Sequence, residues 1–164
     1  MELIDMTDAP PGARQARLTY HDSSARAVFC TDAEVPFPDG RLIVSRADLK
    51  GDITHANEAF VEMSGYTLED LIGAPQHILR HPDMPKAVFK GLWETVGRGE
   101  KWHGYVKNLR KDGKHYWVYA TIVPNVRAAV VTGYTAVRRK PSRTRVAEAE
   151  VLYAQWLKLE GTPA

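Results

Sequence analysis

Hydrophobic residues open the folded part of the chain in two short runs. The first covers residues 42–45 and the second residues 53–56, with Gly51 in the turn-forming segment between them. Runs of this length bounded by turn residues are typical of strands. The pattern therefore predicts two short antiparallel strands.

Helical spacing replaces this pattern further along the chain. A short apolar run follows Asn57 and stops at Gly65, and Thr67 with Asp70 forms a capping arrangement for a second short helix. Beyond these, apolar side chains recur on one helical face at Val88, Phe89, Leu92, Trp93 and Val96. We expect two short helices followed by one longer helix.

The next segment returns to strands. Residues 102–109 and 115–123 are rich in aromatic and β-branched side chains and flank the turn 111–114, which predicts a hairpin, and 130–137 predicts a further strand. The order of elements predicts an α+β fold. Its five-stranded antiparallel sheet has helices covering one face, and the two layers enclose a cavity.

The two ends of the chain lie outside this pattern. Residues 1–39 show no sustained periodicity, and we expect a tail or cap with at most a short helix. The predicted domain covers residues 40–138, and residues 139–164 contain a linker and an amphipathic helix. The apolar stripe of that helix has to be buried, so we expect a homodimer formed through the N-terminal segment or the terminal helix.

Composition excludes several classes of protein. The net charge is only +2 and the basic residues are interspersed with acids, so we expect no nucleic-acid partner. The single cysteine, Cys30, excludes an internal disulfide framework and a cysteine-rich metal site. No apolar run approaches about 18 residues, which argues against membrane insertion. We expect a cytoplasmic protein.

The segment 79–85, Leu-Arg-His-Pro-Asp-Met-Pro, combines three polar side chains with two prolines that stiffen the backbone. It leads into the longer helix, where polar groups are often found against a ligand. In one interpretation Arg80 and His81 face a ligand and Asp83 orients them. In the other, Asp83 only caps the helix and pairs with Arg80.

Three stretches resemble the PAS domain family, and more narrowly the PAS domains of aerotaxis receptors. These stretches are residues 53–61, residues 80–85, and residues 102–108 continuing through 111–118. The Ile-Thr-x-Ala-Asn that opens the first stretch and the Lys-Asp-Gly turn of the third are generic to PAS domains. The sequence Arg-His-Pro-Asp-Met-Pro with a downstream Trp-x-Gly-x-Val-Lys-Asn is far more particular and is similar to the aerotaxis-receptor type.

The resemblance implies a PAS sensor that holds FAD without a covalent bond and signals redox, oxygen or energy status. A flavin needs an apolar slot, amides for its pyrimidine edge and cations for its phosphates. Strand alternation places Trp102 and Asn108 on one sheet face, with Gly104 between them leaving room for a planar ligand. The candidate cofactor-binding residues are Asn57, Arg80, His81, Asp83, Trp93, Trp102 and Asn108.

Several alternatives remain open at this stage. A haem-binding PAS domain needs an axial histidine, for which His77 or His81 would serve. We otherwise expect His77 to be a surface or core residue. Asn57 would also be explained as a helix cap, and Asn108 as a surface amide. A ligand-free dimerisation module fits the terminal segments.

Two further classes are disfavoured. Flavin photochemistry through a cysteine needs that cysteine in the helical region, whereas Cys30 lies in the N-terminal segment. For an enzyme, His81 and Asp83 would be a base and its orienting group, but no nucleophile elbow, phosphate loop or metal-ligand spacing accompanies them. We therefore expect a non-enzymatic sensor that alters its contacts with a downstream chemoreceptor or kinase.

Overall fold

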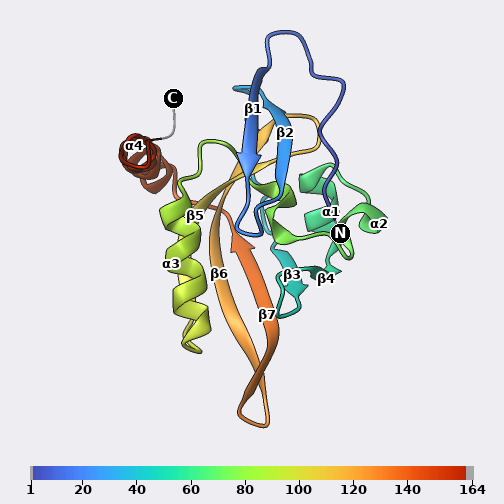
Figure 1. The fold of residues 1–164 in the computed structure, drawn as a ribbon, viewed down its shortest axis with the longest axis vertical. Coiled ribbons are helices and arrows are strands. Elements are labelled where there is room, and N and C mark those ends of the chain that lie inside the picture. The colour runs from blue at the N-terminus through green and yellow to red at the C-terminus, as the bar shows by residue number, and fades with distance from the viewer. Residues whose placement is uncertain (1, 162–164) are drawn as a thin grey trace.

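The computed structural model describes residues 2–161. The central element is a five-stranded antiparallel sheet with the strand order β4-β3-β7-β6-β5. Its members are β3 (Ile43–Ala47), β4 (Ile53–Ala56), β5 (Trp102–Leu109), β6 (His115–Arg127) and β7 (Val130–Arg139). The predicted α+β architecture is confirmed, and β6 and β7 extend as a long hairpin beyond the sheet (Figure 1).

The helices between β4 and β5 follow their sequence signals closely. These are α1 (Glu58–Ser64), α2 (Leu68–Leu71), the 3-10 helix η1 (Gln76–Leu79) and α3 (Lys86–Gly97). Asn57 caps α1, and Thr67 and Asp70 form the predicted capping box of α2. Gly65 ends α1 with a φ of 77°, a conformation that favours glycine.

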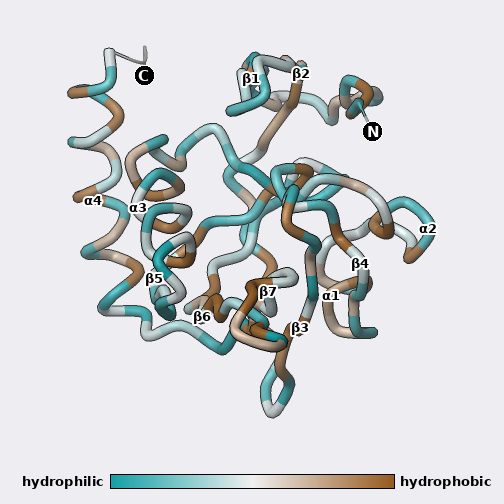
Figure 2. Tube along the Cα trace, turned by 60° about the horizontal axis from the view of Figure 1, so that its bottom comes forward, coloured by the Kyte–Doolittle hydropathy of each residue, from teal (hydrophilic) through white to brown (hydrophobic). Residues whose placement is uncertain are grey.

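The two faces of the sheet are covered by different helices. On β6, Tyr116, Val118 and Ala120 belong to the core cluster that includes Phe60 of α1. Trp117 points the opposite way, as strand alternation requires, and packs against the terminal helix α4 (Arg143–Leu159). Figure 2 shows α4 beside α3, away from α1 and α2.

The N-terminal segment is a β-hairpin, so the expected tail with a short helix is wrong. Strands β1 (Arg14–Thr19) and β2 (Ala25–Cys30) pair with each other and with no strand of the main sheet. The hairpin packs through Val28 and Cys30 onto Leu109. Apolar and polar side chains alternate in both strands, but charged residues interrupt the pattern. The apolar positions become buried only because the hairpin contacts the rest of the domain.

The terminal helix folds back onto its own chain. Val146, Ala149 and Tyr153 are buried in a cluster with Trp117, and the Tyr153 hydroxyl donates to the carbonyl oxygen of Tyr105 at 2.6 Å. Most of the apolar stripe is therefore covered within one molecule, although Leu152 remains 41% exposed. The homodimer was expected because this stripe has to be buried, and most of it is buried without a second copy of the chain.

Candidate functional site: a cavity between α3 and the sheet

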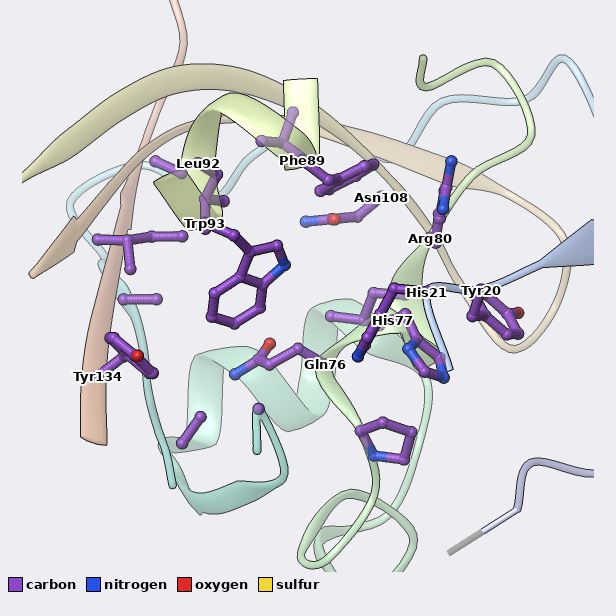
Figure 3. A pocket seen from close by; sticks show the side chains of 18 of the residues that line it. Tyr20, His21, Gln76, His77, Arg80, Phe89, Leu92, Trp93, Asn108 and Tyr134 are labelled. Carbon is purple, nitrogen blue, oxygen red and sulfur yellow. The ribbon is translucent and has the colours of Figure 1, made fainter. Parts of the chain in front are cut away.

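A cavity of about 460 Å³ lies between α3, η1 and the inner face of the sheet (Figure 3). Its walls are largely apolar, because the inward-facing positions of three strands carry small or aliphatic side chains opposite the apolar face of α3. These apolar residues include Leu79, Phe89, Leu92, Val106, Ala120 and Ile122. The volume lies within the range of about 300–1,000 Å³ that is common for ligand pockets.

Asn108 supplies an unpaired amide to this cavity. The residue is 6% exposed, and its Nδ2 group is buried without a hydrogen-bond partner among the described residues. Figure 3 shows the amide pointing into the cavity. A buried amide without a partner costs about 1–3 kcal/mol, so the arrangement suits a ligand that accepts this hydrogen bond.

Arg80 lies beside Asn108. An isolated β-bridge joins the backbones of the two residues, so the segment 79–85 and the strand β5 meet at the cavity. The Arg80 guanidinium lies over the ring of Phe89, 4.9 Å from its centroid, and its Nε is buried without a hydrogen-bond partner among residues 2–161. Burial lowers the pKa of Arg80.

Tyr20 and His77 form a stacked pair on the wall between the hairpin and η1. Their ring centroids are 3.8 Å apart and the planes are inclined by 8°. Burial lowers the pKa of His77 to about 4, so the imidazole is neutral at neutral pH. His77, expected as an ordinary surface or core histidine, thus contributes to the cavity together with the N-terminal hairpin.

The lining of the cavity is strongly cationic. Lys50, Lys86 and Lys90 are exposed lining residues, and Arg80 and Arg138 are the more buried ones. Within residues 2–161, no Asp or Glu side chain lines the cavity. An occupant with negative charge would therefore meet five cations and no opposing carboxylate.

Trp93 also reaches the cavity, from α3. Its indole packs edge-on against Tyr134 of β7, with 5.5 Å between ring centroids and 76° between the planes. The residue is 37% exposed. Together with Arg80 and Asn108, it is one of three predicted site residues that line the cavity.

Asn57 does not line this cavity. Its Oδ1 accepts from the backbone amides of Phe60 and Val44 at 3.1 Å each, and its Nδ2 donates to the carbonyl of Leu42 at 2.9 Å. The cap interpretation thus accounts for the whole amide. The side chain joins α1 to the edge of β3.

His81 and Asp83 also lie outside the lining. The Nδ1 of His81 accepts from the backbone amide of Asp83 at 3.0 Å, and its ring faces His115 with centroids 5.9 Å apart. Asp83 accepts from Lys107 at 2.9 Å and from Arg14 at 2.7 Å. These contacts tie the segment 79–85 to β5 and to the N-terminal hairpin.

Burial and the charge of Lys107 shift the pKa of Asp83 in opposite directions, but they shift the pKa of His81 in the same direction. Burial would raise the pKa of the Asp83 carboxyl, but the hydrogen bond from Lys107 and the neighbouring positive charges lower it. Burial, and then the nearby Lys107, lowers the pKa of His81. His81 is therefore neutral at neutral pH and does not supply the positive charge expected of it.

Trp102 fills the space that we expected Gly104 to leave for a ligand. A Cβ placed on Gly104 would lie 2.5 Å from Cζ2 of the Trp102 indole, so the indole lies directly over the glycine. Trp102 packs against the cores on both sides of the sheet edge and is not among the cavity-lining residues. The glycine makes room for the protein's own side chain.

Comparison with known proteins gives the family. A family model described as "PAS fold" matches residues 53–137. The chain belongs to the PAS family. This PAS domain is 46% identical over 125 residues to the aerotaxis receptor of Escherichia coli K12, which covers 76% of the chain and 25% of the receptor. It is 31% identical over 83 residues to a nitrogen fixation regulatory protein of Klebsiella pneumoniae, 51% of the chain and 17% of that protein.

Solved structures have the same fold. The PAS domain of a Colwellia psychrerythraea protein superposes with a TM-score of 0.57 at 25% identity, over 62% of this chain and 87% of that one. A light-oxygen-voltage domain gives a TM-score of 0.60 at 24% identity, over 70% and 87% of the two chains. The PAS domain spans a quarter of the length of the aerotaxis receptor that it matches.

Sequence reasoning missed several lining residues of this PAS domain, including Tyr20, Gln76 and Arg138. Tyr20 belongs to the segment interpreted as a tail. Arg138 stands in the basic run 138–140, which looked like a solvated connector. Arg138 and Arg139 are neighbours on β7, and strand alternation points such neighbours to opposite faces of the sheet. Arg138 is buried and Arg139 is exposed, so alternation was the signal that could have identified Arg138.

Two further features are absent from the part of the chain that the structure describes. No helix within residues 2–161 is long and apolar enough to span a membrane. In that same part of the PAS domain, no group of three or more His, Cys, Asp or Glu side chains is arranged to hold a metal ion.

Proposed function

We propose that this PAS domain binds FAD without a covalent bond in the cavity between α3 and the sheet and signals redox, oxygen or energy status to a partner. The observation that carries the proposal is the unpaired Asn108 amide in a largely apolar, cation-rich cavity. The resemblance of residues 80–85 and 102–108 to aerotaxis-receptor PAS domains supports the choice of FAD.

The residues present fit the chemical parts of a flavin dinucleotide. The apolar walls, with Phe89 and Trp93, suit the tricyclic ring, and Asn108 suits its hydrogen-bonding edge. Lys86 and Lys90, exposed on α3, suit phosphate groups that keep part of their hydration. Bound there, FAD would supply reversible electron transfer.

The chain's own groups would convert a change of charge in the cavity into a change of contacts. Arg80 is half-buried, carries a positive charge and belongs to the segment that Asp83 ties to both β5 and the hairpin. His77 on the cavity wall stacks on Tyr20 of that hairpin. A shift at either residue would alter how the hairpin packs, and the hairpin is therefore the output surface of the proposed sensor.

In this proposal the protein is a cytoplasmic, non-enzymatic sensor that acts on a chemoreceptor or kinase. The similarity to an aerotaxis receptor supports a chemotaxis partner. The other relative, a nitrogen fixation regulatory protein, supports signal transduction more broadly.

Haem is a second candidate, favoured by the position of His77. A neutral imidazole on the cavity wall is the form that ligates iron, and burial keeps His77 neutral. His81 is less suited, because its Nδ1 is engaged with the Asp83 amide and the residue lies outside the lining.

The absorption spectrum of the purified protein, with mass spectrometry of the released cofactor, tests the proposal. We expect the two absorption bands of oxidised flavin and the mass of FAD. A haem spectrum would select the alternative. A colourless protein that takes up neither FAD nor haem would support a ligand-free interaction module.

Two amide variants locate the site within the protein. Asn108→Leu removes the unpaired amide and should release most of the flavin. Asn57→Asp keeps the Oδ1 acceptor that caps α1, so its flavin content should equal that of the wild type. Loss of flavin from Asn57→Asp, with retention by Asn108→Leu, would place the cofactor elsewhere.

A further inference from the structure

Arg138 is a buried cation without a carboxylate partner. It is 7% exposed, and no Asp or Glu among residues 2–161 forms an ion pair with it. Its Nη1 donates to the Ser45 hydroxyl at 3.1 Å, its Nη2 donates to Oε1 of Gln76 at 3.4 Å, and its Cζ lies 4.9 Å from the Phe60 ring centroid. These three contacts are all with uncharged groups.

Such a group destabilises a protein unless something compensates its charge. Removing an ion from water costs several kcal/mol even after relaxation, and neutral acceptors offset only part of that cost. A guanidinium also carries five N–H donors, more than the two hydrogen bonds formed here. Arg138 lines the cavity, so a ligand can supply the missing negative charge.

The distribution of charge along the cavity indicates which part of a ligand meets Arg138. The exposed lysines, Lys50, Lys86 and Lys90, suit phosphates, which are strongly hydrated. Arg138 is buried and lies within hydrogen-bond distance of the half-buried Gln76, and Asn108 is a buried amide of the same lining. Uncharged polar atoms are less costly to bury there than phosphates.

We propose that Arg138 faces the polar edge of the bound flavin and stabilises the negative charge that this edge gains on reduction. This inference rests on the proposed function, since it concerns the same cavity. The contact with Arg138 strengthens the binding of reduced flavin more than that of oxidised flavin. By thermodynamic linkage, the bound flavin then has a higher midpoint potential than it would have without Arg138.

The proposal assigns to Arg138 a role that the sequence suggested for Arg80 and His81. His81 lies outside the cavity lining and is neutral. Arg138 also links the cavity to two elements, because Ser45 is on β3 and Gln76 begins η1. Negative charge on the reduced flavin would draw the guanidinium toward the cavity and weaken its hydrogen bonds to Ser45 and Gln76. The redox state of the flavin would in this way change the packing between β3 and η1.

The test compares Arg138→Met and Arg138→Lys with the matched control Arg139→Met, which removes an exposed arginine from the same strand. FAD is titrated into the flavin-stripped protein in its oxidised form, and the midpoint potential of the bound flavin is measured against redox dyes. We expect the Arg138→Met substitution to lower the affinity for reduced FAD about tenfold more than the affinity for oxidised FAD. The midpoint potential of the bound flavin should fall accordingly. Arg138→Lys keeps the charge and most of the potential, and Arg139→Met matches the wild type.

Melting of the flavin-stripped proteins provides a second readout. An uncompensated buried charge predicts that Arg138→Met melts at a higher temperature than the wild type without flavin. A purely structural arginine would predict a lower one. A second control is Lys90→Met, at the exposed end of the cavity. This substitution should weaken the binding of oxidised and reduced FAD equally and leave the midpoint potential of the bound flavin unchanged.

The outcomes separate the two proposals. A wild-type protein that takes up no flavin overturns the proposed function, and this inference with it. Flavin binding by Arg138→Met with an unchanged potential overturns the inference alone, as does a lower melting temperature of the flavin-stripped variant.

Discussion

The phenol ring of Tyr20 stacks on the imidazole of His77, with 3.8 Å between the ring centroids. Tyr20 directly follows β1, the first strand of the N-terminal hairpin, and His77 belongs to η1. The contact therefore joins the hairpin to the cavity wall. Tyr20 is 4% exposed, which makes it one of the most buried residues of the hairpin.

Removal of this stack should open the cavity wall. We expect Tyr20→Ala to cost about 3 kcal/mol of stability and to raise the pKa of His77 from about 4 toward its ordinary value of 6.5, because burial is the main cause of the shift. Chemical denaturation and an NMR titration of the imidazole measure the two effects. Tyr20→Phe is the control, since the Tyr20 hydroxyl has no partner among the described residues. An unchanged His77 pKa in Tyr20→Ala would contradict this account.

Acid should destabilise the folded protein over a defined range of pH. The pKa of His77 is lowered from 6.5 to about 4, and burial also lowers that of His81. Below about pH 6.5 the unfolded chain binds more protons at these sites than the folded chain does. Stability is therefore complete above that pH and declines as the pH falls toward 4, by at most about 1.4 kcal/mol per pH unit for each histidine.

Melting temperatures measured from neutral pH down to about pH 4 check this dependence. His77→Gln should make the decline shallower. His55→Gln, a change at an exposed position of β4, should leave it as in the wild type. A melting temperature that does not fall over this range would refute the assignment of these buried neutral histidines.

Gly104 should not tolerate a side chain while Trp102 is present. Because a Cβ would overlap the indole, Gly104→Ala is expected to displace Trp102 and cost about 1–3 kcal/mol. Denaturant unfolding measures the loss, and tryptophan fluorescence reports the altered environment. In the background of Trp102→Val, the same glycine substitution should cost much less. Equal costs in the two backgrounds would mean that the indole does not occupy this space.

Much of the fold could be predicted from local patterns. The caps at Asn57 and Thr67, the stop at Gly65 and the apolar face of α3 depend on residues a few positions apart, and the structure confirms each. The hairpin β5–β6 follows equally from its turn. The N-terminal hairpin was missed, because its apolar positions are few and become buried only against Leu109 and its neighbours.

The candidate site was harder to predict, because neighbours in sequence point in different directions. Arg80 lines the cavity, whereas His81 faces His115 and Asp83 faces Lys107. The motif marked a segment that borders the cavity, but it did not indicate which of its side chains faces the cavity. Backbone direction at the end of η1 decides that division, and no period in the sequence encodes it.

By itself, the sequence determined the order of helices and strands from β3 onward apart from η1, their caps and turns, and a segment that borders the cavity, because these depend on interactions between close neighbours in the chain. Only the tertiary structure decided which side chains share the cavity. Arg138 meets Ser45 across 93 positions of sequence, and Tyr20 meets His77 across two separate elements. Such contacts arise from how the elements pack together, which is a property of the whole fold.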